Sequence, residues 1–290
     1  MLMAKPDKSM ATTVPLLELA SGARMPALGM GTWRMGERAR DRVREVAALR
    51  RGLDLGMALI DTAEMYADGG AEKVVGEAIA GRRDQVFVVS KVLPSHATRR
   101  GVVAACERSL RRLGTDWIDL YLLHWRGEVP LAETLAGFER LRSAGRVRHW
   151  GVSNLDRGEI GEIRALPEGK HCAADQVLYH LDCRGIEWDL LPECRRRHIV
   201  VMAYSPFDEG RLLRDRRLVD LAHRVGATPA QVAIAWLLAQ RNVAVIPKAS
   251  DVSHVQDNFT ALDVKISSAL RTDIDRLFPP PKRATPLAMI

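Results

Sequence analysis

Short runs of apolar residues, rich in valine, isoleucine and leucine, recur along the chain, and longer amphipathic stretches separate them. Apolar runs without polar alternation are typical of strands that are buried on both faces of a parallel sheet. This pattern predicts eight strands, at Ala27–Met30, Ala58–Thr62, Val86–Val92, Ile118–His124, Val147–Val152, Ala174–Tyr179, Ile199–Tyr204 and Val243–Lys248.

The stretches between these runs carry the start and stop signals of helices. One helix is predicted from about Arg38 to Gly56, where the glycine suits a left-handed cap. Further helices are expected to begin after Thr98, at Pro130 and after Ser153, where Ser153 and Asp156 suggest a capping box. Thr228-Pro229 with Gln231 combines an N-cap, a proline in the first turn and a capping-box partner.

Eight strand–helix units form either an open doubly wound sheet or a closed barrel. No strand is followed by the glycine pattern G-x-G-x-x-G of a dinucleotide-binding sheet, and the length suits a barrel of about 250 residues with additions. We therefore predict an α/β fold, a (β/α)8 TIM barrel. Leu16–Leu19 and Ala23–Met25 predict an N-terminal β-hairpin over the barrel floor, and Pro279 to Ile290 predicts an extended C-terminal tail. Residues 1–13 are expected to be a disordered tail, and residues 14–290 a single domain.

The formal net charge of +7 raises the question of nucleic-acid binding. The basic cluster Arg195-Arg196-Arg197 lies on a helical segment without interleaved aromatics, which favours a solvated helix face over a nucleic-acid surface. The four cysteines show no metal-ligand spacing and are predicted to be free thiols. No apolar run approaches the roughly 18 residues of a membrane span, so we expect no membrane partner and a cytoplasmic location.

Ionisable residues stand at the ends of three consecutive predicted strands. Asp61 ends the second strand with Tyr66 in the following loop, Lys91 interrupts the third, and His124 ends the fourth. Taken singly, Asp61 suits a helix cap and His124 a core histidine, but an ammonium on a buried strand needs a partner. Because the carboxyl ends of barrel strands meet at one opening, we expect the four side chains to lie together.

A phenol beside an ammonium suits protonation of an oxygen that gains negative charge. We expect Lys91, oriented by Asp61, to lower the pKa of Tyr66, and His124 to bind the substrate oxygen or relay a proton. Such charge develops when a carbonyl accepts hydride, and hydride requires a cofactor because no side chain supplies it.

This set resembles the catalytic tetrad of the aldo-keto reductase superfamily, and Asp61 to Ile79 (DTAEMYADGGAEKVVGEAI) resembles that family's first signature. The similarity spans about Leu16 to Leu277. It implies reduction of a small-molecule carbonyl, a nicotinamide cofactor bound in an extended form, and a monomer.

The resemblance also implies a set of cofactor contacts. The residues that match are Gly31, Thr32, Trp33, Asp61, Ser153, Asn154, Gln176, Tyr204 and Ser205 at the nicotinamide end, and Lys248, Ala249, Ser250, His254, Asp257 and Asn258 at the adenosine end. Lys248 beside a helix N-terminus makes an anion site that favours NADPH through its 2′-phosphate. Ala249 stands where many members have serine, and His254 where many have arginine, so NADH remains possible. Structural alternatives are helix capping for Ser153-Asn154 and core packing for Tyr204.

The substrate pocket is predicted to be apolar and aromatic, from Trp33, Met65, Trp125 and Phe207, with the tail closing one side; Phe207 has core packing as its alternative role. Two other functions are open from the residues. One is a Schiff-base enzyme that uses Lys91 as its nucleophile. The other is an NADPH-binding regulatory or redox-sensing barrel without turnover.

Overall fold

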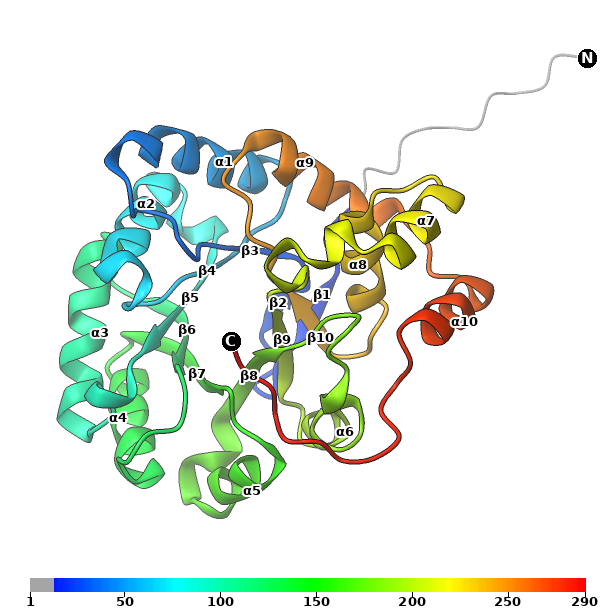
Figure 1. The fold of residues 1–290 in the computed structure, drawn as a ribbon. Helices are drawn as coiled ribbons and strands as arrows, with labels where there is room; N and C mark the ends of the chain where they lie inside the picture. Colours follow the sequence, from blue (N-terminus) through cyan, green and yellow to red (C-terminus); the bar gives the residue numbers. More distant parts are fainter. Residues whose placement is uncertain (1–12) are drawn as a thin grey trace, which may run out of the picture.

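The computed structural model describes residues 13–290 and shows a ring of parallel strands surrounded by helices (Figure 1). The predicted disordered segment lies outside the described residues except for Thr13. The strands of the ring are β3 (Gly29–Gly31), β4 (Leu59–Asp61), β5 (Phe87–Val92), β6 (Ile118–Leu123), β7 (Val147–Ser153), β8 (Cys172–Leu178), β9 (Val200–Tyr204) and β10 (Val243–Val245).

Each strand of the ring pairs in parallel with the next one in the sequence, from β3 to β10. Bridges from Leu28 to Val245 and from Gly31 to Lys248 join the first strand to the last, and the Val245 amide donates to the Ala27 carbonyl at 2.8 Å. The predicted (β/α)8 barrel is thus confirmed. The last strand is shorter than predicted because Pro247 has no amide hydrogen with which to continue the ladder.

The predicted N-terminal hairpin is also present, as β1 (Leu16–Glu18) paired antiparallel with β2 (Arg24–Pro26). Leu19 and Met25 are buried against inward-facing strand residues such as Leu59, Val89 and Leu120. The hairpin therefore closes the barrel at the amino ends of the strands and leaves the carboxyl ends open.

Ten α-helices are described within residues 13–290. They are α1 (Arg42–Asp54), α2 (Gly70–Ile79), α3 (Arg99–Leu113), α4 (Leu131–Ser143), α5 (Arg157–Ala165), α6 (Leu190–Arg196), α7 (Arg216–Arg224), α8 (Pro229–Leu238), α9 (Val252–Thr260) and α10 (Ser268–Leu277). None of the helices in this part of the chain is both long and apolar enough to cross a membrane.

The helix starts test the predicted caps. Thr98 accepts a hydrogen bond from the Gly101 amide at 3.1 Å, and Thr228 forms the predicted capping box with Gln231. The capping box predicted for Ser153 and Asp156 is wrong. Ser153 is still in β7, where its hydroxyl donates to the Gln176 carbonyl of β8 at 2.8 Å. The box that starts α5 instead joins Asp156 to Glu159.

The tail is held by a buried arginine before it crosses the barrel opening. Arg184 forms an ion pair with Asp275 of α10 at 2.8 Å and donates to the Phe278 carbonyl. Residues 279–290 then run without helix or strand toward the middle of the barrel (Figure 1, red). Met289 and Ile290 line the cavity there, so the predicted course of the tail is confirmed.

Asp175 of β8 points away from the barrel axis into the packing beneath the helices, and it is fully buried. Neither carboxyl oxygen has a hydrogen-bond partner among the described residues. Burial raises the pKa of Asp175 well above its usual range, and the nearby Leu155 amide offsets only part of that effect. The carboxyl group is therefore accommodated in its protonated form.

We expect Asp175→Asn to stabilise the protein above about pH 5. The pKa of Asp175 is higher in the folded than in the unfolded chain, so the unfolding free energy falls as the pH rises through the unfolded value near 4. The neutral amide removes this loss, with a gain of about 1 kcal/mol or more at pH 8 and little at pH 4. Urea unfolding at both pH values, with the partly exposed Glu168→Gln as control, measures the effect. Equal stability of Asp175→Asn and the unmodified protein at pH 8 would contradict the assignment.

Candidate active site

A cavity of about 500 Å³ opens at the carboxyl ends of the barrel strands. Its walls come from the ends of β3, β4, β6, β7, β8 and β9 and from the last residues of the tail. The four predicted pocket residues, Trp33, Met65, Trp125 and Phe207, all line it. The cavity is therefore bounded by aromatic and aliphatic side chains with polar groups at its base.

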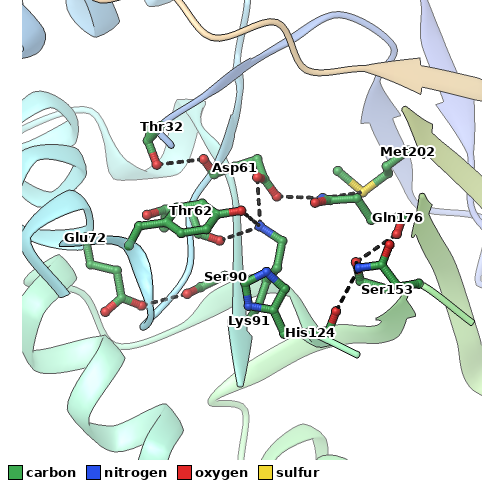
Figure 2. Close-up of polar contacts among 12 residues, drawn as sticks. Thr32, Asp61, Thr62, Glu72, Ser90, Lys91, His124, Ser153, Gln176 and Met202 are labelled. Atoms are coloured by element: carbon green, nitrogen blue, oxygen red, sulfur yellow. Dashed lines mark hydrogen bonds and ion pairs between the residues drawn. The ribbon is translucent and has the colours of Figure 1, made fainter. Parts of the chain in front are cut away.

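The ammonium of Lys91 forms the centre of those polar groups. It donates to Asp61 Oδ2 at 2.8 Å, to the Thr62 carbonyl at 2.9 Å and to the Tyr66 hydroxyl at 3.2 Å. An ammonium has three hydrogens, so all of its donors are used. Figure 2 shows Lys91 reaching from β5 toward Asp61 on the adjacent strand.

Strand register explains why these side chains meet. Asp61 pairs with Val89, and Lys91 lies two residues further along β5 on the same, inward face. From across the barrel, Gln176 Nε2 donates to Asp61 Oδ1 at 2.7 Å (Figure 2). One oxygen of the Asp61 carboxylate thus accepts a hydrogen bond from Lys91, and the other accepts one from Gln176.

The strand that carries Lys91 is also fixed from its outer face. Ser90 points the other way and donates to Glu72 of α2 at 2.6 Å (Figure 2). Glu72 in turn forms an ion pair with Arg112 of α3. Ser90 and Glu72 have no solvent exposure. This contact ties β5 to the helical layer and restricts the backbone from which Lys91 extends.

The charges of the site follow from burial and from these contacts. Burial disfavours the charged form of Lys91, but Asp61 and Tyr66 outweigh it and raise the pKa of the ammonium. The prediction that Lys91 lowers the pKa of Tyr66 below its ordinary value is wrong for the protein alone. Burial raises that pKa, and the ammonium offsets only part of the shift. Tyr66 therefore holds its proton firmly at neutral pH, beside a cation that stabilises the phenolate once the proton leaves.

His124 lies on the other side of Tyr66. The two rings are edge to face with centroids 5.7 Å apart, and Trp33 packs against Tyr66 in the same way at 5.0 Å. Burial, together with the Lys91 charge, lowers the pKa of His124 to about 3. The imidazole is neutral at physiological pH, and it offers one donor and one acceptor.

The predicted amide-binding residues form a connected group at the ends of β7, β8 and β9. The Tyr204 hydroxyl donates to Asn154 Oδ1 at 2.9 Å, and Asn154 Nδ2 lies 3.2 Å from both the His124 carbonyl and Ser153 Oγ. Gln176 uses its Nε2 on Asp61, so its amide oxygen is left as an acceptor.

Of the residues predicted for the adenosine end, only some lie at the cavity. Lys248 lines the cavity, whereas Ala249, Ser250 and His254 lie beyond it, toward and within α9. Asp257 accepts from Thr228 and Gln231 at the start of α8, so its carboxylate is already engaged. Asn258 is buried within α9.

The cavity also contains residues that the sequence analysis missed. These are Arg34, Pro206, Glu209, Gly210, Leu213 and Ile246. Met289 and Ile290 also line the cavity, and they belong to the tail that was predicted to close one side of it. Arg34 directly follows Trp33, which was predicted to line the cavity, so its position in the sequence was a signal for Arg34. Glu209 has a left-handed backbone (φ 51°) in the loop after β9, and no sequence pattern predicts its position at the cavity.

The sequence profile of the Aldo/keto reductase family matches residues 27–278. Methylglyoxal reductase YeaE of Escherichia coli (strain K12) is 50% identical over 95% of this chain and 99% of its own. The 9,11-endoperoxide prostaglandin H2 reductase of Trypanosoma cruzi is 32% identical over 89% of this chain and 90% of its own.

Solved structures show the same relationship. The aldo/keto reductase of Klebsiella pneumoniae in complex with NADP and acetate superimposes with a TM-score of 0.92 at 49% identity, covering 95% of this chain and 99% of that one. A thermostable aldo-keto reductase, Tm1743, in complex with the inhibitor epalrestat gives 0.85 at 38% identity, covering 91% and 99%. This chain belongs to the aldo/keto reductase family and is an oxidoreductase.

Proposed function

We propose that the protein reduces small aldehydes and ketones to alcohols with NADPH, and that short dicarbonyls such as methylglyoxal are among its substrates. The observation that carries the proposal is at the base of the aromatic-walled cavity. There the Lys91 ammonium donates all three of its hydrogens, to Asp61, Thr62 and Tyr66. The methylglyoxal reductase at 50% identity supports the choice of substrate.

Tyr66 is proposed as the proton donor. The carbonyl oxygen gains negative charge as its carbon is reduced, and a phenol that is still protonated at neutral pH can transfer its proton to that oxygen. The phenolate that remains lies 3.2 Å from the Lys91 ammonium, which stabilises it. Asp61 keeps Lys91 charged and oriented throughout.

His124 is proposed to orient the substrate. Its neutral ring lies at the cavity beside Tyr66, and Nδ1 is buried without a hydrogen-bond partner among the described residues. The other ring nitrogen is then available to hydrogen-bond the carbonyl oxygen. With Trp33 and Trp125 flanking the two polar rings, a small carbonyl compound is held with its oxygen toward Tyr66.

NADPH supplies the hydride when bound. The Gln176 amide oxygen, with Ser153 and Asn154, would hold the carboxamide of the nicotinamide, and Tyr204 would pack against its ring. The polar side-chain groups of Ser153, Asn154 and Tyr204 and the Gln176 carbonyl are joined by hydrogen bonds on one wall of the cavity. This arrangement of donors and acceptors fits a ring that carries an amide. Lys248 at the rim would bind the 2′-phosphate.

The two other functions are less well supported by the geometry. A Schiff-base nucleophile needs a neutral amine with a free lone pair, but Lys91 is held charged and all of its hydrogens are donated. A purely regulatory barrel gives no role to the Tyr66–Lys91 contact.

The protein is also proposed to be a monomer, which size-exclusion chromatography tests, and to be located in the cytoplasm.

Tyr66→Phe is expected to lower kcat for methylglyoxal reduction by about 100-fold or more, because the general acid is lost. The affinity for NADPH should stay within twofold, because the ring remains in place. NADPH consumption at 340 nm gives kcat, and fluorescence titration gives the dissociation constant. Near-normal turnover in this variant would rule out Tyr66 as the proton donor.

His124 is expected to show no protonation between pH 5 and pH 8, since burial and Lys91 lower its pKa to about 3. NMR of ¹³C-labelled histidine would follow its ring carbon across this range, with His124→Asn used to assign the signal. A midpoint near pH 6.5 for that signal would show that the ring can act as an acid at neutral pH and would contradict the orienting role.

Lys248→Met is expected to weaken NADPH binding about tenfold and to leave NADH binding nearly unchanged, because only NADPH carries the 2′-phosphate. Lys170→Met removes the same charge from an exposed site elsewhere and serves as the control. Equal losses for both coenzymes would remove the phosphate assignment for Lys248.

A further inference from the structure

We propose that Arg44 of α1 is a second cationic ligand of the adenosine 2′-phosphate and takes part in the choice of NADPH over NADH. The inference rests on the proposed function, because it assigns a specificity residue to the same coenzyme. Arg44 lies 204 positions before Lys248 in the sequence, outside the segments that were predicted to contact the coenzyme.

The packing of α1 against α9 places Arg44. The two helices lie side by side on the outside of the barrel (Figure 1), and Arg51 of α1 donates to Gln256 of α9 at 2.6 Å. Both helices follow a strand of the ring and run back beside it, so they are parallel and both begin near the open end of the barrel.

This contact sets the register between the helices. Arg44 precedes Arg51 by seven residues, which is about two turns or 10 Å along the axis and returns to nearly the same face. Seven residues before Gln256 is Ala249, between Lys248 and the first turn of α9. Arg44 therefore faces the segment that carries Lys248 at one end and His254 at the other.

The electrostatic effects on Lys248 and Asp251 agree with this register between α1 and α9. Partial desolvation lowers the pKa of Lys248; Arg44 and Arg34 lower it further, while Glu45 and Glu37 oppose them. Hydrogen bonds from Ser253 lower the pKa of Asp251, and the charges of His254 and Arg44 act in the same direction. The side chain of Arg44 thus lies within electrostatic range of Lys248 and of Asp251 at the start of α9.

The guanidinium of Arg44 is free to bind a ligand. Its side chain is 56% exposed, and its hydrogen bond within residues 13–290 is a single contact to Asp41 at 3.2 Å. A guanidinium has five donors in a planar fork that matches a phosphate group, so most of them remain unused. A dianionic phosphate between Lys248 and Arg44 would be held by two cations.

Arg44→Met tests the inference, with Arg50→Met as the matched control. Arg50 lies on the same helix but turns toward α2, where it donates to the Glu77 carbonyl at 2.9 Å, so its loss changes the net charge equally. Fluorescence titrations at pH 8 and low salt would measure NADPH and NADH. Competition with 2′,5′-ADP and 5′-AMP would isolate the adenosine end.

Arg44→Met is expected to weaken NADPH and 2′,5′-ADP about tenfold and to change NADH and 5′-AMP less than twofold, while Arg50→Met behaves like the unmodified protein. The same result for both variants would overturn the inference while leaving the proposed function intact. A failure of the unmodified protein to bind NADPH would instead refute the proposed function.

A double-mutant cycle tests whether Arg44 and residue 254 reach the same phosphate. His254→Arg should tighten NADPH, and Arg44→Met should then weaken it by a smaller factor, because the new guanidinium replaces part of the lost charge. An unchanged factor in the His254→Arg background would contradict a shared phosphate.

Discussion

The ammonium of Lys91 has no solvent exposure, and it is accommodated inside the barrel because three acceptors surround it. A buried charge without such partners is strongly unfavourable. Two of the acceptors belong to β4 and the residue after it, and the third belongs to the loop that follows. The need to satisfy one cation therefore fixes the relative positions of a strand end, a strand and a loop.

The same requirement links the two halves of the barrel. Asp61 uses its second oxygen on Gln176, which lies on the far side of the ring, and Gln176 in turn accepts the Ser153 hydroxyl through its backbone carbonyl. The side of the cavity that carries Tyr66 and Lys91 and the side that carries Ser153 and Gln176 are thus parts of one hydrogen-bonded network. A displacement of either side would leave a buried polar group unsatisfied.

Much of this arrangement could be predicted from the sequence because it follows from strand ends. An apolar run that stops at an ionisable residue, repeated on adjacent strands of a barrel, leaves few places for those residues to meet. The cap assigned to Ser153 failed because its hydroxyl has a closer acceptor across the sheet, which sequence spacing does not reveal. The pKa of Tyr66 was misjudged because the pattern shows the neighbouring charge but not the extent of burial. The engagement of Asp257 with α8 and the approach of Arg44 to Lys248 depend on how helices pack, and no local pattern contains that information.

Arg184 joins the last turn of α10 to the loop after β8, and beyond this clamp the chain makes no ladder contacts with the ring. One wall of the cavity is therefore formed by a segment whose sequence is not constrained by barrel closure. Such a wall can change in length or in side-chain size while the hydrogen-bonded base of the cavity stays the same. Within this architecture, the selection of different carbonyl compounds is separable from the machinery that reduces them.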